Sequence, residues 1–112
     1  MERRATVYVN RQAAAELRKH SESGVQQYEL RYFPDYLHDS QATAVSLLLP
    51  LRSEPYYSAS LFPCFDNMLP EGESRRGICQ RLRLDEEDSF GLLLALAQYD
   101  TIGAVTVREE VR

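Results

Sequence analysis

The 112-residue chain contains little lysine or glycine, on which phosphate-binding enzyme sites depend. Lys19 is the only lysine, and the five glycines are scattered along the chain. Neither a G-x-x-x-x-G-K-[ST] loop nor a kinase-like glycine-rich loop occurs, so the sequence offers no phosphate cradle of the kind that phosphoryl transfer needs. We therefore expect no enzyme activity, no catalytic residue and no cofactor.

Cysteines and long apolar runs are also scarce. The two cysteines, Cys64 and Cys79, have a spacing that matches no zinc-binding pattern. The longest apolar run, residues 92–97, is far shorter than a membrane span, and the N-terminal residues do not resemble a secretory signal. We expect a cytoplasmic protein with reduced thiols, no metal site and no membrane contact.

The charge balance is acidic, with 13 basic and 17 acidic residues and a net charge of −4. Direct nucleic-acid binding is not expected, because a phosphate backbone requires a concentrated basic surface. Twelve of the basic residues are arginines, a residue type enriched at protein interfaces. High-GC codon usage is the alternative explanation of this bias.

The first half of the chain carries strand patterns. Residues 6–9 are β-branched and aromatic, and residues 26–33 alternate between apolar and polar side chains, as in a half-buried antiparallel strand. Residues 12–19 are ambiguous, because their alanines favour a helix by propensity. A further strand is expected at residues 45–49, which are mostly apolar and precede a proline.

The second half carries helix patterns. Ser60 is expected to cap a helix that runs to about residue 69, with Pro63 in the first turn, where its missing N–H costs nothing. A second helix is expected at residues 74–82, and a third is expected after Asp85, its predicted N-cap. The third helix should bury an apolar stripe formed by Phe90, Leu93, Leu94 and Ala97.

A last strand is expected at residues 104–107, after a turn at Gly103. The expected fold class is therefore α+β, with a small, mostly antiparallel sheet and about three helices in the C-terminal half. No linker or repeat interrupts the pattern, so residues 1–112 are expected to form a single domain.

Several polar side chains that often carry chemistry lack a motif around them. His20 and His38 lie in polar stretches with no other ligand at metal-binding spacing, so we expect solvated surface histidines. Ser58 and Ser60 have no nucleophile motif such as G-x-S-x-G. The acidic run at residues 86–88 fits a helix start better than a metal site.

A cluster of aromatic residues and its polar neighbours form the predicted partner-binding set. Its members are Tyr56, Tyr57, Phe62, Phe65, Asp66 and Asn67. Aromatic side chains can anchor an interface because they bring a large area at small rotamer cost. Phe62 and Phe65 are favoured as mainly core residues, and projection of one of them toward a partner is the alternative. Asp66 and Asn67 either bond to neighbouring backbone or hold a loop that faces the partner.

Residues 61–72, L-F-P-C-F-D-N-M-L-P-E-G, resemble the N-terminal subdomain of HipA-type toxin kinases. Further pieces occur in the family's order at residues 7–10, 28–37 and 46–51. A later block comprises Asp85, Asp88, Phe90, Leu93, Leu94, Asp100, Gly103, Ala104 and Val105. The resemblance covers essentially the whole chain, and it implies a strand at residues 12–19. Cys64, where an aromatic is common, and Gly77, within an expected helix, depart from the pattern.

The resemblance implies a fold and a partner rather than an activity, because the catalytic machinery of such kinases lies in a larger region that would follow residue 112. Free-standing versions of this subdomain resemble HipS-type proteins, the small antitoxins of HipBST toxin–antitoxin systems. We therefore expect an antitoxin that neutralises a HipT-like serine/threonine kinase toxin by stoichiometric binding. A HipB-like DNA-binding protein is a further expected partner in a ternary complex, without direct contact between this chain and nucleic acid.

Two other interpretations of the resemblance stay open. In the first, the chain is a non-inhibitory structural subunit that completes a HipT–HipB complex. In the second, it is an N-terminal fragment of a HipA-like kinase.

Overall fold

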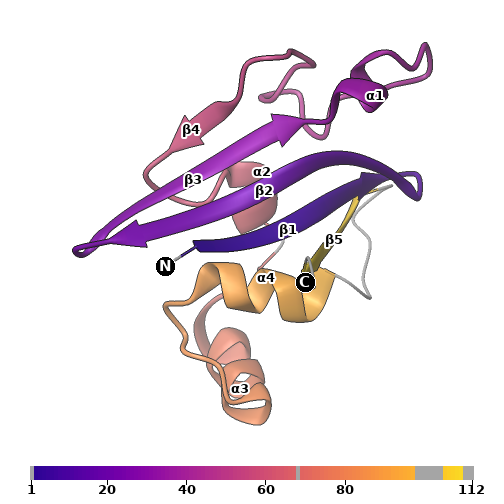
Figure 1. Ribbon diagram of the computed structural model, residues 1–112. Helices are drawn as coiled ribbons and strands as arrows, with labels where there is room; N and C mark the ends of the chain where they lie inside the picture. The colour runs from indigo at the N-terminus through magenta and orange to yellow at the C-terminus, as the bar shows by residue number, and fades with distance from the viewer. Residues whose placement is uncertain (1, 68, 98–104, 110–112) are drawn as a thin grey trace.

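The computed structural model describes residues 2–67, 69–97 and 105–109, and within them five strands form one antiparallel sheet in the order β4-β3-β2-β1-β5 (Figure 1). The α+β fold class expected from the sequence is confirmed. In chain order the elements are β1 (Glu2–Val9), β2 (Gln12–Glu22), β3 (Val25–Tyr32), α1 (Pro34–Leu37), β4 (Tyr56–Ser58), α2 (Pro63–Asp66), α3 (Gly72–Leu82), α4 (Ser89–Ala97) and β5 (Val105–Glu109).

The first three strands form a meander joined by two-residue turns. Asn10 and Arg11 connect β1 to β2, Ser23 and Gly24 connect β2 to β3, and all four residues have positive φ. Positive φ at both positions defines a type I′ turn, whose twist matches that of paired strands. The ambiguous residues 12–19 accordingly lie in a strand, as the family resemblance implied.

A β-bulge shapes the pairing of β1 with β2. The register slips by one residue between Val7 and Tyr8, which leaves Ala14 of β2 without a cross-strand partner. Ala14 and Ala15 are therefore both fully buried, which strict alternation would not allow. The Ala14 carbonyl accepts a hydrogen bond from the N–H of Phe33 at 2.9 Å, which ties the end of β3 to the bulge.

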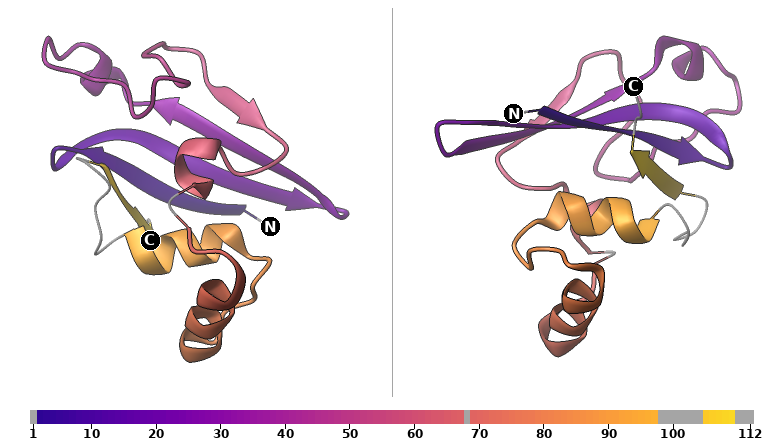
Figure 2. Two further views of the ribbon diagram at one scale, coloured as in Figure 1. Left: turned by 180° about the vertical axis from the view of Figure 1, so that it is seen from behind. Right: turned by 60° about the horizontal axis from the view of Figure 1, so that its bottom comes forward.

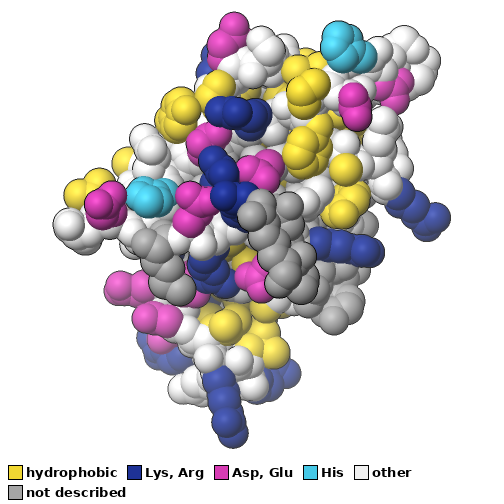
Figure 3. All heavy atoms as spheres, viewed as in Figure 1, with side chains coloured by type: hydrophobic (Ala, Val, Ile, Leu, Met, Phe, Trp, Pro, Cys, Tyr) yellow, Lys and Arg dark blue, Asp and Glu magenta, His cyan; other side chains and the backbone are white. Residues whose placement is uncertain are grey.

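The two faces of the sheet differ sharply. The buried face contains a row formed by Val107, Val7, Ala15 and Tyr32 and a second row formed by Ala5, Leu17 and Leu30. The opposite face carries charged side chains, among them Arg18, whose Nε lies 2.8 Å from the Glu16 carboxylate. Figure 3 shows basic and acidic side chains next to one another over β1 and β2. Partly exposed pairs of this kind contribute little stability, so the buried rows provide the main stabilisation.

Helices cover the buried face of the sheet. Figure 2 shows α4 packed below the sheet and α3 on the far side of α4. The buried side chains of α4 are Phe90, Leu92, Leu93 and Leu94. Phe90 lies 6.4 Å from Tyr28 of β3, measured between ring centroids. The predicted stripe is confirmed for its three described members, Phe90, Leu93 and Leu94, whereas the side chain of Ala97 lies outside the described set.

The prediction of a strand at residues 45–49 is wrong. Ser46 and Leu49 form an isolated bridge across a tight turn, in which the Leu49 N–H donates to the Ser46 carbonyl at 3.0 Å. Leu47 and Leu48 lie at the tip of this turn and are exposed. The apolar run favoured a buried strand, but three successive leucines cannot all face the core where the chain turns back. A short strand, β4, instead occurs at Tyr56–Ser58.

The helix expected from Ser60 to about residue 69 is much shorter, because α2 spans only Pro63–Asp66. Phe62, not Ser60, occupies the N-cap position, with φ −58° and ψ 138°. Extended backbone is what a residue before proline prefers, so Pro63 excludes Phe62 from the helix. A further short helix, α1, follows β3 and begins at Pro34.

The prediction of Asp85 as an N-cap is also wrong, because α4 begins at Ser89. Asp85 accepts the N–H of Glu87 at 2.9 Å in a preceding turn, whereas Asp88 accepts the N–H of Gly91 at 2.9 Å and caps the helix. A Cβ at position 91 would overlap the Asp88 carboxylate in its present position, so a larger residue there would require that side chain to shift.

The remaining predicted elements agree with the structure. The helix expected at residues 74–82 corresponds to α3, and the last strand expected at 104–107 corresponds to β5. Asp100, Gly103 and Ala104, which belong to the resemblance, lie outside the described residues.

Candidate protein-binding surface

The two tyrosines of the predicted partner-binding set point to opposite faces of the sheet. Tyr56 pairs with Leu30 and therefore faces the buried side, and Tyr57 pairs with Glu29 and faces the charged side. Tyr57 is 57% exposed. Tyr57 is thus available for direct contact with a partner, and the half-buried Tyr56 has a structural role described below.

Phe62 and Phe65 belong to the hydrophobic core of the isolated chain. Phe62 is 6% exposed and Phe65 is 1% exposed, and α2, which carries Phe65, packs against α4. This placement agrees with the favoured of the two sequence interpretations. In this conformation neither ring is exposed for contact with another protein.

Asp66 and Asn67 are exposed at the C-terminal end of α2. Their backbone closes the helix, because the Asn67 N–H donates to the Pro63 carbonyl at 2.9 Å and the Asp66 carbonyl accepts from the Leu69 N–H at 3.1 Å. They lie on the helix-covered side of the sheet, whereas Tyr57 faces the other side. The structure therefore does not bring the six residues of the predicted set into one patch.

An exposed group of leucines was missed by the sequence analysis. Leu47 is 97% exposed, Leu48 is 72% exposed and Leu51 is 37% exposed. We call these three residues the leucine knob. The sequence does contain a usable signal. The run L-L-L-P-L has neither the two-residue period of a half-buried strand nor the period of a helix, so one regular element cannot bury all of its leucines. Figure 3 shows hydrophobic side chains at the surface in the upper part of the molecule, where β4 and α1 lie.

Tyrosine hydroxyl groups hold the turn that carries Leu47 and Leu48. The Tyr32 hydroxyl donates to the Leu49 carbonyl and accepts from the Val45 N–H at 2.9 Å, so one side chain of β3 fixes both ends of the turn. Leu49 itself is buried beneath the turn. The leucines at the tip are therefore presented by an ordered turn.

Two further tyrosines continue this framework on either side of the turn. The Tyr36 hydroxyl donates to the Thr43 carbonyl at 2.7 Å and accepts from the Thr43 N–H at 3.0 Å. The Tyr56 hydroxyl donates to the Pro50 carbonyl at 2.6 Å, next to Leu51. These side chains replace the ladder hydrogen bonds that the segment lacks, because it forms no extended strand.

Arg52 turns its charge back onto the loop that follows the knob. Its guanidinium carbon lies 3.6 Å from the centroid of the Tyr56 ring, and it donates to the carbonyls of Glu54 and Pro55 at 3.1 and 3.0 Å. The guanidinium is therefore engaged locally, which stiffens the chain after Leu51 and leaves the knob apolar.

Burial keeps two ionisable groups of this region neutral. Desolvation raises the pKa of Tyr32 to about 12, and the Val45 N–H, which bonds its hydroxyl, opposes that rise only in part. Burial likewise raises the pKa of the Cys64 thiol to about 11. Cys64 therefore lacks the thiolate character of a reactive cysteine at neutral pH.

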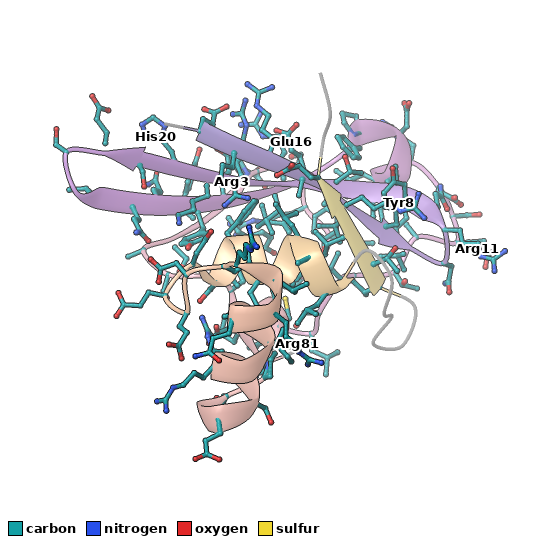
Figure 4. The ribbon with its side chains drawn as sticks, turned by 90° about the horizontal axis from the view of Figure 1, so that it is seen from below. Arg3, Tyr8, Arg11, Glu16, His20 and Arg81 are labelled. Carbon is teal, nitrogen blue, oxygen red and sulfur yellow. The ribbon has the colours of Figure 1, made fainter. Side chains whose placement is uncertain are left out.

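A groove near the β2–β3 hairpin is lined mainly by polar side chains. Its lining includes His20, Glu22, Gln26, Gln27 and Tyr57. Figure 4 shows His20 toward one end of the sheet and Tyr8 and Arg11 toward the other. Across residues 2–67, 69–97 and 105–109, no group of three or more His, Cys, Asp or Glu residues is arranged to hold a metal ion. In the same ranges, none of the helices has the length and apolar character needed to cross a membrane.

Comparisons with known proteins agree with one another. The family model described as HipA N-terminal domain matches residues 5–108. An uncharacterised protein of Haemophilus influenzae (strain ATCC 51907 / DSM 11121 / KW20 / Rd) is 35% identical over 83 residues, which cover 74% of this chain and 74% of that protein. A solved structure of the N-terminal domain of HipA toxin is 26% identical, covers 98% of this chain and 94% of its own, and superposes with a TM-score of 0.68.

Proposed function

Because this chain belongs to the HipA N-terminal domain family, we propose that it is an antitoxin that binds a HipA-type kinase, in particular a HipT-like serine/threonine kinase toxin, and neutralises it by stoichiometric association. The whole chain acts as one domain, without catalysis of its own. The encounter takes place in the cytoplasm, where both thiols stay reduced.

The observation that carries this proposal is the match of 98% of the chain to one domain of the HipA toxin. A protein with this fold can take the position beside a kinase that the covalently attached domain takes in the toxin. The relative from Haemophilus influenzae matches over equal shares of both proteins and is thus of similar length, which supports a small free-standing form in this family.

Stoichiometric binding is physically sufficient for inhibition. A standard interface covers roughly 800 Å² on each partner, which is about a tenth of the 7343 Å² accessible surface of this chain. Occupation of such an area near the kinase cleft blocks nucleotide or substrate access without any chemistry on this chain. Tyr57, Asp66 and Asn67 are the members of the predicted set that are exposed for contact, and Phe62 and Phe65 maintain the shape of α2.

Reconstitution tests the proposal. The purified chain is mixed with the HipT-like kinase encoded by the same genome, the mixture is separated by size exclusion, and kinase autophosphorylation is measured at increasing molar ratios. We expect co-elution and a loss of autophosphorylation that is complete near equimolar protein. Unchanged kinase activity at excess protein contradicts the antitoxin proposal.

The same experiment separates a structural role from an inhibitory one. Co-elution with full kinase activity indicates a non-inhibitory subunit that completes the kinase and joins it to a HipB-like DNA-binding protein. Addition of that HipB-like protein then tests for a ternary complex. Because the chain carries a net charge of −4, we expect DNA binding by the complex to depend on the HipB-like protein.

A further inference from the structure

We propose that the leucine knob, Leu47, Leu48 and Leu51, is the apolar anchor that inserts into a hydrophobic groove of the partner kinase. This inference rests on the proposed kinase-binding function and assigns part of that interface to residues outside the predicted partner-binding set. Leu47 at 97% exposure and Leu48 at 72% exposure are adjacent, so they form one apolar tip rather than two scattered surface residues.

The knob is built to bind with little loss of conformational freedom. Its turn is closed by the Ser46–Leu49 bridge and held from below by the Tyr32 hydroxyl, which bonds to both Val45 and Leu49. The Ser46 hydroxyl also accepts the N–H of Leu48 at 3.2 Å. A side chain presented by an ordered turn has less entropy to lose on association than one on an unstructured loop.

The far side of the knob is held in the same way. Tyr56 bonds to the carbonyl of Pro50 at 2.6 Å, and Arg52 bonds to the carbonyls of Glu54 and Pro55. Leu51 therefore lies between two fixed positions. Three leucines are thus displayed in a defined arrangement, so a partner groove can bury their apolar area at little ordering cost.

The kinase is the occupant that the observations favour. The solved structure that this chain matches is a domain of the HipA toxin, and a domain of a larger protein carries a face that packs on its neighbour. When the domain is a separate chain, that face is exposed until the neighbour binds. The leucine knob is the most exposed concentration of leucines among the described residues, so it is the strongest candidate for that face.

Other occupants fit the surface less well. Membrane-binding segments usually combine apolar residues with several basic ones, whereas Arg52 and Glu54 are the only charged residues between positions 43 and 55, and the Arg52 guanidinium is engaged locally. For a second copy of the chain, the groove at Tyr57 contains the charged Glu22, and a second groove is lined by Arg3, Lys19, Ser21 and Asp88. An apolar tip in either groove would desolvate charged side chains without pairing them.

The experiment compares a double variant, Leu47→Ser with Leu48→Ser, with a control, Leu82→Ser. Leu82 is 47% exposed on α3 and lies outside the knob, so the control makes the same chemical change at another exposed leucine. Affinity for the HipT-like kinase is measured by calorimetry, folding by circular dichroism, and oligomeric state by light scattering. We expect the double variant to bind about 100-fold more weakly, since burial of each leucine contributes about ten-fold. The control should bind within about two-fold of the wild type.

Each outcome decides between the proposals. A folded double variant with wild-type affinity overturns the knob inference and leaves the antitoxin proposal intact. A wild-type chain that does not bind the kinase overturns both. A double variant that does not fold shows that the leucines are structural and overturns the inference. A wild-type dimer that becomes monomeric in the double variant with unchanged kinase affinity assigns the knob to a second copy and also overturns it.

Discussion

Two apolar segments close together in the chain lie in opposite environments. Leu61, Phe62 and Phe65 around the start of α2 are buried, whereas Leu47 and Leu48 in the turn before β4 are exposed. Both segments are rich in large apolar residues and both adjoin a proline. The difference lies in what faces them, because α2 packs against α4 beside the sheet while the tip of the turn meets only solvent. Hydrophobicity therefore indicates that a segment needs a partner surface, and the fold decides whether that surface belongs to the same chain.

The largest effect should come from Phe65→Ala. Removal of a ring that is 1% exposed leaves a cavity in the core and should lower the free energy of unfolding by about 3–5 kcal/mol. Kinase binding should weaken with it, because the exposed Asp66 and Asn67 depend on α2. Urea unfolding followed by circular dichroism measures the loss. The matched control, Leu47→Ala, should change stability by less than about 0.5 kcal/mol, and equal losses in the two variants would contradict the contrast between the segments.

Alkaline pH should act on the exposed segment through its support, Tyr32. The pKa of this tyrosine is about 12 in the folded chain against 10.0 as the ordinary value, so the fold favours the neutral phenol. Its contribution to stability is complete below about pH 10 and is lost as the pH rises through about 12. A difference of two units corresponds to roughly 3 kcal/mol. Chemical unfolding at a series of pH values from 8 to 12 measures this slope.

Burial also raises the pKa of Tyr28, so Tyr28 adds to the alkaline loss. The difference between the wild type and Tyr32→Phe isolates the part due to Tyr32, because Tyr28 is present in both proteins. If stability depends on pH identically in the two proteins, ionisation of Tyr32 is not coupled to unfolding.

At neutral pH, Tyr32→Phe should lower the free energy of unfolding by about 1–3 kcal/mol. The change leaves the Val45 N–H and the Leu49 carbonyl without their side-chain partner. It also releases the turn, so kinase affinity should fall even though Leu47 and Leu48 are intact. Tyr57→Phe is the stability control, because Tyr57 is exposed and its hydroxyl fixes no turn. Unchanged affinity of folded Tyr32→Phe would show that the order of the turn contributes nothing to binding.

The smallest effect should come from Tyr57→Ala, which tests the only strongly exposed aromatic of the predicted partner-binding set. Its stability should change by less than about 0.5 kcal/mol, and its kinase affinity should fall by about ten-fold, equivalent to about 1.4 kcal/mol. Calorimetric titration against the kinase measures the change. Wild-type affinity in this variant removes Tyr57 from the interface and leaves the leucine knob and the end of α2 as its candidates.

Several elements were predictable because their signals are local. Alternation identified the strand that contains Tyr28, Leu30 and Tyr32, and the spacing of Phe90, Leu93 and Leu94 identified the buried side of α4. The expected cap at Asp85 failed because four acidic residues in a row offer several caps of similar quality. The choice of Asp88 depends on contacts that lie far away in the chain, since Arg3 of β1 approaches its carboxylate at 3.2 Å.

The candidate site was less predictable than the fold. The sequence identified aromatic residues, but it did not show that Tyr56 and Tyr57 face opposite sides of an edge strand or that α2 buries Phe65. The exposed leucines were missed because an apolar run before a proline is usually a buried strand. Tyr32 and Tyr56 hold the knob through hydrogen bonds from their hydroxyl groups to the carbonyls of Leu49 and Pro50. The sequence pattern indicated only that these tyrosines belong to a core or an interface, and it did not indicate these hydrogen bonds.

Local sequence was enough to determine β1, β3, α3 and the buried side of α4, because hydrophobic period acts over a few neighbouring positions, whereas β2 was ambiguous by local propensity. Only the tertiary structure decided which apolar residues stay outside. Burial depends on what the rest of the chain places opposite a side chain: α4 packs against α2, which carries the buried Phe65, whereas Leu47 stays in solvent.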